Sequence, residues 1–138
     1  MKNHFILAIA TLLLFSCSSD KRNSLEHFTK AKELYKNNDI NNASSEIELA
    51  IKLDSTNLDF QITKAKIISK TENFEMAIAI LMDISNKKFK LDTVNFELGS
   101  CYFDYAKYFS MKQNSKEKEI DAYEKAITYY NNAINLNM

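Results

Sequence analysis

The sequence predicts an all-α protein built from three helical hairpins, of which the third is lengthened. Three observations lead to this prediction. The 138 residues include one Gly and no Pro, apolar residues recur at spacings of three and four, and residue types repeat at intervals of 34. Sheets need Gly and Pro in their turns, whereas apolar residues three and four apart line one face of a helix. The length suits a single domain.

The composition argues against several classes of function. Lys and Arg number 18 and Asp and Glu number 18, so the formal net charge is zero. Nucleic-acid binding requires cations gathered on one face, and phosphate-binding loops require Gly. We therefore expect no nucleic-acid partner and no cofactor. An apolar fraction of 46% with 12% aromatic residues is typical of a chain that folds.

Residues 1–16 have the pattern of a secretory signal peptide. Lys2 precedes an 11-residue apolar run from Phe5 to Phe15, which is too short for a spanning helix, since that needs about 20 apolar residues. The run ends in Leu14-Phe15-Ser16-Cys17, which resembles the lipobox of bacterial lipoproteins. The resemblance implies that a lipid is attached to Cys17, and Ser18 after it implies transfer to the outer membrane.

Residues 17–23 would then form a lipidated Cys and a short tether. Its six residues after Cys17 reach roughly 20 Å when extended, so the folded part, residues 24–138, would lie close to the membrane in the bacterial cell envelope, facing the periplasm. The alternative is an ordinary signal peptide with a chance Cys near its end.

The folded part repeats with a period of 34 residues. Small residues mark the first helix of each pair at Ala31, Ala65 and Gly99, and the second helix at Ala43, Ala77 and Ala126. Small side chains let a partner helix approach closely, and a helix pair that cannot bury its apolar face alone is stabilised by stacking on the next pair. We divide this part into repeats 24–57, 58–91 and 92–138.

Leu98-Gly99-x-x-Tyr102 and Ala126-x-x-x-Tyr130 resemble the two halves of the tetratricopeptide repeat (TPR) motif. The resemblance implies an α-solenoid whose concave face binds a peptide or a protein. The chain departs from the family pattern in two ways: no Trp opens any repeat, and Ser55, Phe89 and Met138 stand where the family has Pro.

Six helices are expected, near residues 24–37, 40–53, 58–71, 74–86, 92–113 and 116–136. Each has, at or just before its start, a side chain that can accept a hydrogen bond from the free amides of a first helical turn. These side chains are Ser24, Asp39, Asn57, Asn73, Asp92 and Ser115.

The third repeat has 15 additional residues, because Gly99 to Ala126 spans 27 residues where Ala31 to Ala43 spans 12. Fifteen is close to the number that adds two turns to each helix without rotating its buried face. We therefore predict a long antiparallel hairpin. Its two facing stripes would be Leu98, Tyr102, Tyr105 and Phe109 on one helix and Ile120, Tyr123, Ile127, Tyr130 and Ile134 on the other.

No residue pattern indicates catalysis. His27 is the one histidine outside the signal peptide, so no metal site is expected. Cys101 falls on the buried side of a helix, where a thiol behaves as a small apolar group, and no base or oxyanion hole accompanies it. We predict a non-enzymatic protein.

The TPR resemblance places the partner-binding residues on the concave face, along the first helix of each pair. They are Leu25, Phe28, Lys32, Tyr35, Lys36, Ile62, Lys66, Ser69, Lys70, Phe96, Ser100 and Phe103. Apolar and cationic side chains alternate in this set, which suits an extended or helical peptide with apolar anchors and acidic groups. The alternative is that the four lysines form a solvated helix surface.

These features together predict a lipid-anchored scaffold that binds a protein or peptide partner in its groove. One alternative is a self-associating structural or assembly lipoprotein, of the kind that supports outer-membrane insertion, pilus or secretin biogenesis; it would use the third hairpin and form a homodimer. A mass that rises with concentration to twice the monomer's would favour it. A second alternative, an enzyme or a small-ligand carrier, would gain from observed turnover or from a retained small molecule.

Overall fold

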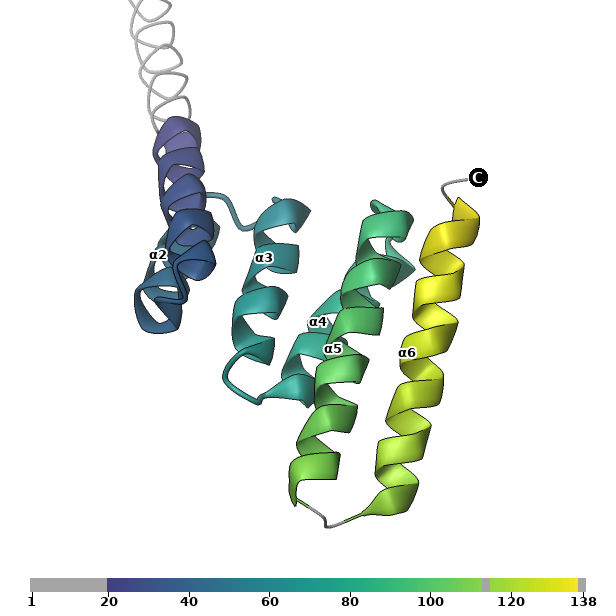
Figure 1. Ribbon diagram of the computed structural model, residues 1–138. Coiled ribbons are helices and arrows are strands. Elements are labelled where there is room, and N and C mark those ends of the chain that lie inside the picture. Colours follow the sequence, from purple (N-terminus) through teal and green to yellow (C-terminus); the bar gives the residue numbers. More distant parts are fainter. Residues whose placement is uncertain (1–19, 113–114, 137–138) are drawn as a thin grey trace, which may run out of the picture. The chain divides into compact units, whose positions relative to one another are not determined.

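The computed structural model describes residues 20–112 and 115–136. Over these residues every regular element is a helix and no strand is present (Figure 1), which confirms the all-α prediction. None of the described helices is long and apolar enough to cross a membrane. The predicted signal peptide and the predictions for Cys17 and Ser18 lie outside the described residues.

The chain divides into two compact units, Met1–Asn57 and Leu58–Met138. The first contains the helix over residues 20–36 and α2 (Ile40–Leu53). Ala31 and Ala43 are both fully buried, as expected of the small residues in a closely packed helix pair.

A polar cluster joins the two helices of the first unit. Glu46 of α2 lies 2.6 Å from His27 Nδ1 and 2.5 Å from Lys30 Nζ of the first helix. Hydrogen bonds from Lys30 and then from His27 hold the pKa of the Glu46 carboxyl below its usual value. His27 is therefore bonded to a carboxylate, with one-third of its side chain exposed.

The first helix includes residues that were expected to lie in the tether. Residues 20–23 are helical, and Ser24, expected at the helix start, is fully buried with its Oγ donating to the Lys21 carbonyl at 2.8 Å. The prediction of an extended tether is therefore wrong for residues 20–23. No Gly or Pro stands here to stop a helix.

The second unit contains α3 (Leu58–Ser69), α4 (Phe74–Asn86), α5 (Leu91–Lys112) and α6 (Lys116–Leu136). Each helix packs on the next, and α3 also contacts α5. α5 and α6 form the long antiparallel hairpin that the 15 added residues predicted, seen in Figure 1 as two neighbouring green and yellow helices. The helix bounds lie within two residues of those expected.

Two of the expected N-terminal caps are confirmed by side-chain hydrogen bonds. Asp39 accepts from the Asn42 amide at 3.3 Å before α2, and Ser115 accepts from the Lys118 amide at 3.3 Å before α6. Asn73 precedes α4 without a side-chain cap bond. Asp92 lies inside the first turn of α5, where its charge complements the positive end of the helix.

The turns use left-handed backbone without glycine. Asn38 and Glu72 follow helices with φ of 60° and 61°, and Lys88 and Lys90 have φ of 54° and 43°. A side chain in this region costs roughly 1–2 kcal/mol relative to right-handed backbone. The chain's single glycine, Gly99, lies inside α5 and not in a turn.

Gly99 is needed for the close approach of α6. A Cβ atom built on it would lie 2.7 Å from Cδ1 and 2.9 Å from Cγ of Tyr130, much closer than the 3.5–4.0 Å or so of ordinary carbon contacts. The aromatic ring thus packs directly on the α5 backbone. The sequence predicted a close approach of the partner helix at Gly99, and Tyr130 is the residue that makes it.

The buried face of α6 differs from the prediction. Ala122, Ala126 and Ala133 are buried, whereas Ile120, Ile127 and Ile134 are 49%, 60% and 57% exposed. The prediction that the isoleucines line the hairpin seam is therefore wrong. The alanines face α5 because small side chains bring the helix axes close together.

On α5 the predicted stripe is buried or half-buried, but it does not face α6 alone as predicted. Leu98 is fully buried, Phe109 is 9% exposed, and Tyr102 stacks on Tyr129 of α6 with ring centroids 5.5 Å apart. Tyr105 is half-buried and donates a hydrogen bond from its hydroxyl to Glu75 of α4. The long hairpin is thus held to α4 through this face.

Candidate protein-interaction site

The predicted groove residues are divided between the two units. Five belong to the helix over residues 20–36: Leu25, Phe28, Lys32, Tyr35 and Lys36. There Leu25 is 47% exposed, and the Lys32 ammonium lies 4.7 Å from the centroid of the Phe28 ring. The other seven belong to the second unit, to which the site described below is confined.

Ile62 is not part of a groove. It is 5% exposed and belongs to the core cluster around Ala65, Phe74 and Leu81, so the prediction for this residue is wrong. α3 packs against both α4 and α5, and its buried residues therefore extend over more than one face of the helix. Because two helices cover α3, less of its surface is exposed than if it packed against one helix only.

The remaining six predicted residues lie along α3 and α5 and define what we call the α3–α5 face: Lys66, Ser69, Lys70, Phe96, Ser100 and Phe103. Two ion pairs cross between the helices. Lys66 Nζ lies 2.7 Å from Oε1 of Glu97, and Lys70 Nζ lies 3.2 Å from Oδ2 of Asp104. Each lysine therefore has a carboxylate beside it, and this part of the face carries both signs of charge.

Sequence reasoning missed both acidic partners. Glu97 follows Lys66 by 31 residues and Asp104 follows Lys70 by 34 residues, which are spacings near one repeat. Reading charges at the repeat interval would have found them, because stacked helices bring such positions side by side. Ser69 is also engaged locally, since its Oγ donates to the Lys66 carbonyl at 2.8 Å.

Two phenylalanines form the apolar part of the α3–α5 face. Phe96 is 54% exposed, with its ring centroid 5.6 Å from that of Tyr130. Phe103 is 43% exposed, and its ring lies edge-on to Tyr123 at 5.7 Å. The tyrosines cover part of each ring and leave the rest open. Ser100, between them, accepts a 3.1 Å hydrogen bond from the Tyr130 hydroxyl.

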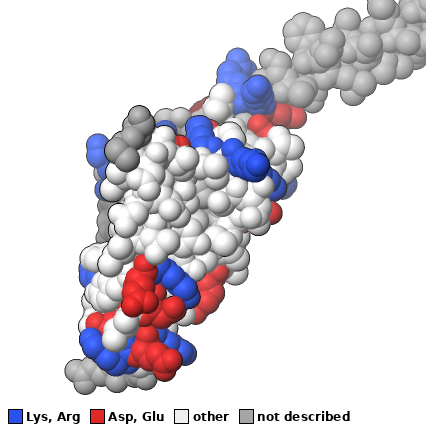
Figure 2. Space-filling model, turned by 90° about the vertical axis from the view of Figure 1, so that its right-hand side faces the viewer, with Lys and Arg blue, Asp and Glu red and all other residues white. Residues whose placement is uncertain are grey.

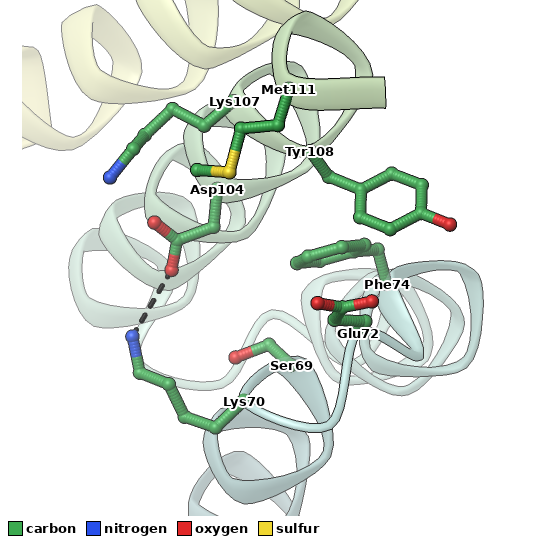
Figure 3. A pocket seen from close by; sticks show the side chains of 8 residues that line it. All are labelled: Ser69, Lys70, Glu72, Phe74, Asp104, Lys107, Tyr108 and Met111. Carbon is green, nitrogen blue, oxygen red and sulfur yellow. Dashed lines mark hydrogen bonds and ion pairs between the residues drawn. The ribbon is translucent and has the colours of Figure 1, made fainter. Parts of the chain in front are cut away.

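A small open pocket of about 180 Å³ lies where α3 and the start of α4 meet the second half of α5 (Figure 3). The Lys70–Asp104 ion pair forms one wall, and Phe74 with Tyr108, ring centroids 5.8 Å apart, forms another. Met111 lies above them. Pockets for small ligands usually measure about 300–1,000 Å³. This one suits a single side chain of a bound protein segment.

The one described cysteine is inert. Cys101 is 3% exposed, and its Sγ lies 3.8 Å from the Phe74 carbonyl oxygen. Burial, followed by the charge of Asp104, raises the pKa of the thiol to about 12. The prediction that Cys101 acts as a small apolar core residue is confirmed. Within residues 20–112 and 115–136, His, Cys, Asp and Glu form no group of three that could hold a metal ion.

Comparison of the chain with protein-family models, with curated proteins and with solved structures finds no match. The function is therefore inferred from the chemistry of the site.

Proposed function

We propose that this protein is a lipid-anchored, non-enzymatic interaction module that holds a peptide or protein segment on its α3–α5 face, at the periplasmic side of a bacterial outer membrane. The observation that carries the proposal is a pair of large, half-exposed aromatic side chains, Phe96 and Phe103, beside two interhelical ion pairs. Exposed aromatic surface with a polar border is characteristic of protein interfaces.

The spacing of these groups suits a helical or extended segment. Phe96 and Phe103 are seven residues apart, which places them about 10 Å apart along the helix axis. That distance matches apolar anchors two turns apart on a partner helix. The pairs Lys66–Glu97 and Lys70–Asp104 offer donors and acceptors at one border. The preferred partner therefore has two apolar anchors and charges of both signs, which revises the expectation of an acidic peptide.

A TPR-like arrangement of the hairpins is part of this proposal. The order of contacts supports it, because each helix of the second unit packs on the next and the first helices of successive pairs, α3 and α5, also meet. The packing of Tyr130 on Gly99 supports it as well. Stacking of this kind presents the first helices along one surface, which is where the α3–α5 face lies.

The anchor is proposed from the sequence around Cys17. Several acyl chains hold a protein on a bilayer far more firmly than one, and an anchored module would meet its partners at the membrane surface. Labelling of cells with a radioactive fatty acid should mark the wild-type chain and leave a Cys17→Ser variant unlabelled. Labelling of both forms equally would refute the assignment of Cys17.

The binding proposal is tested by crosslinking and co-purification of the full chain from its own membrane. A Phe96→Gln, Phe103→Gln double variant should lose a partner that the wild type recovers. Met76→Gln is the matched control, since Met76 is 50% exposed and belongs to α4, which carries none of the residues of the α3–α5 face. Equal recovery of the partner by the wild type and the double variant would refute this face as the binding surface.

A further inference from the structure

We propose that α6 binds a second copy of this chain by pairing antiparallel with the α6 of that copy. The contact would be made through Ile120, Ile127 and Ile134, which we call the α6 stripe. This inference goes beyond the proposed function, because it depends neither on the lipid anchor nor on a different protein as partner, although its contact area includes Phe96 and Phe103 of the α3–α5 face.

The α6 stripe is an apolar row along one side of an otherwise polar helix. Its three isoleucines are 49%, 60% and 57% exposed, and they recur every seven residues, the spacing at which paired helices present apolar side chains to each other. Figure 2 looks at the side of the molecule on which α6 lies in Figure 1. It shows a broad uncharged area, with acidic and basic side chains gathered at its lower end and basic side chains at its upper edge.

Comparison of α6 with α4, the second helix of the preceding hairpin, indicates that a surface like the α6 stripe is normally covered by another helix. Ala77, Ile78 and Leu81 of α4 stand 49 residues before Ala126, Ile127 and Tyr130 of α6. On α4 these positions are covered: Leu81 is 1% exposed, Ile78 packs on the core, and α5 lies against the helix. On α6, Ala126 is buried and Tyr130 packs on Gly99, whereas Ile127, the counterpart of Ile78, is 60% exposed. The natural occupant of this exposed surface is therefore another helix.

The α6 stripe is complementary to itself. Ile120 and Ile134 lie seven residues on either side of Ile127. If two α6 helices run antiparallel with their Ile127 residues facing each other, Ile120 of each copy lies opposite Ile134 of the other. A twofold axis through Ile127 thus fills both halves of the contact with the same residues, as a symmetric dimer requires.

Charge selects the antiparallel arrangement. The start of α6 is charged, with Lys116, Glu117, Lys118 and Glu119, whereas its end carries the amides Asn131, Asn132 and Asn135. Between the two ends, Glu124 borders the α6 stripe. A parallel pair would bring Glu124 against Glu124 and align the two helix dipoles. An antiparallel pair sets the charged start against the uncharged end and opposes the dipoles.

The exposed area is sufficient for a small dimer. If a large apolar side chain offers about 200 Å² in all, the three isoleucines with the adjoining Phe96 and Phe103 leave roughly 500 Å² exposed in each copy. Two copies would then bury about 1,000 Å², near the lower limit for specific protein interfaces. α6 is 21 residues long, about 32 Å, so one helix can carry the whole contact.

The test is site-directed crosslinking of the full chain in cells, with a short bis-maleimide. Single variants Ile127→Cys, Ile120→Cys, Ile134→Cys and Met76→Cys are made, and Ile120→Cys is also co-expressed with Ile134→Cys under different epitope tags. The wild type controls for the native cysteines. The replaced side chains are about half exposed, so the variants should fold, and their helix content is checked by circular dichroism.

Ile127→Cys should give a crosslinked dimer several-fold above the level of Met76→Cys. The mixed Ile120→Cys and Ile134→Cys pair should crosslink several-fold more than either variant alone, because each residue is opposite the other. Ile120→Lys added to Ile127→Cys should lower the dimer yield. The proposal is overturned if Ile127→Cys crosslinks no more than Met76→Cys, or links mainly to a different protein. Strong self-crosslinking of both Ile120→Cys and Ile134→Cys would also overturn it, since that result requires a parallel pair.

Discussion

Replacing Gly99 by Ala tests how closely α5 and α6 approach each other. The added methyl group would meet three ring atoms of Tyr130 at 2.7 to 2.9 Å, so the ring must move by about 1 Å to restore ordinary contact. The ring is not free to do so. It packs against Phe96 at 5.6 Å, and its hydroxyl is hydrogen-bonded to Ser100 at 3.1 Å.

Two effects of opposite sign decide the result. Alanine is favoured over glycine inside a helix by about 1 kcal/mol. Forcing an extra methyl group into a packed contact costs typically about 1–3 kcal/mol. Gly99→Ala should therefore destabilise the protein by about 1 kcal/mol, and thermal unfolding followed by circular dichroism should show a midpoint lower by about 3–4 °C.

A second variant separates the two effects. In a Tyr130→Ala background the ring is gone, so Gly99→Ala should now stabilise the helix by about 1 kcal/mol. The sign of the substitution thus reverses between the two backgrounds, and the double-mutant cycle gives the steric coupling directly. If Gly99→Ala stabilises both backgrounds equally, the close contact between Gly99 and Tyr130 does not exist.

Three further predictions concern the turns, the first unit and the core. Glu72→Gly should stabilise the protein by about 0.5–1 kcal/mol in urea unfolding, because it relieves left-handed backbone at φ 61°; a loss of stability would contradict that conformation. Glu46→Gln should cost on the order of 1 kcal/mol at pH 7, after allowance for solvent screening. Folding lowers the pKa of Glu46, so its contribution is complete above about pH 4.5, the unfolded value, and disappears as the pH falls through the lower folded value. The difference in unfolding midpoint between the wild type and Glu46→Gln should therefore shrink in acid, and a constant difference would contradict the assignment. Cys101 should resist iodoacetamide at pH 8 until urea unfolds the protein, as burial raises its pKa to about 12; rapid labelling of the folded form would show that the thiol is accessible.

Local sequence determined the helices of this protein. Apart from the start of the first helix, their bounds follow from apolar spacing and from capping side chains such as Asp39 and Ser115, which act within one turn of the chain. The close approach of the partner helix at Gly99 could also be predicted, because a residue without a side chain admits a neighbour against the backbone, whereas its contact with Tyr130 came from the structure. The burial of Cys101 followed from its place on the same helix.

Tertiary structure decided which surfaces remain open. α6 carries both an alanine stripe and an isoleucine stripe, and periodicity alone does not say which one faces α5. The alanines are buried because they allow the helices to approach closely, which leaves the isoleucines exposed. The burial of Ile62 and the ion pairs of Lys66 and Lys70 were decided by neighbouring helices in the same way. A repeat pattern specifies which residues share a helix face, whereas contact between helices distant in sequence determines whether that face is covered.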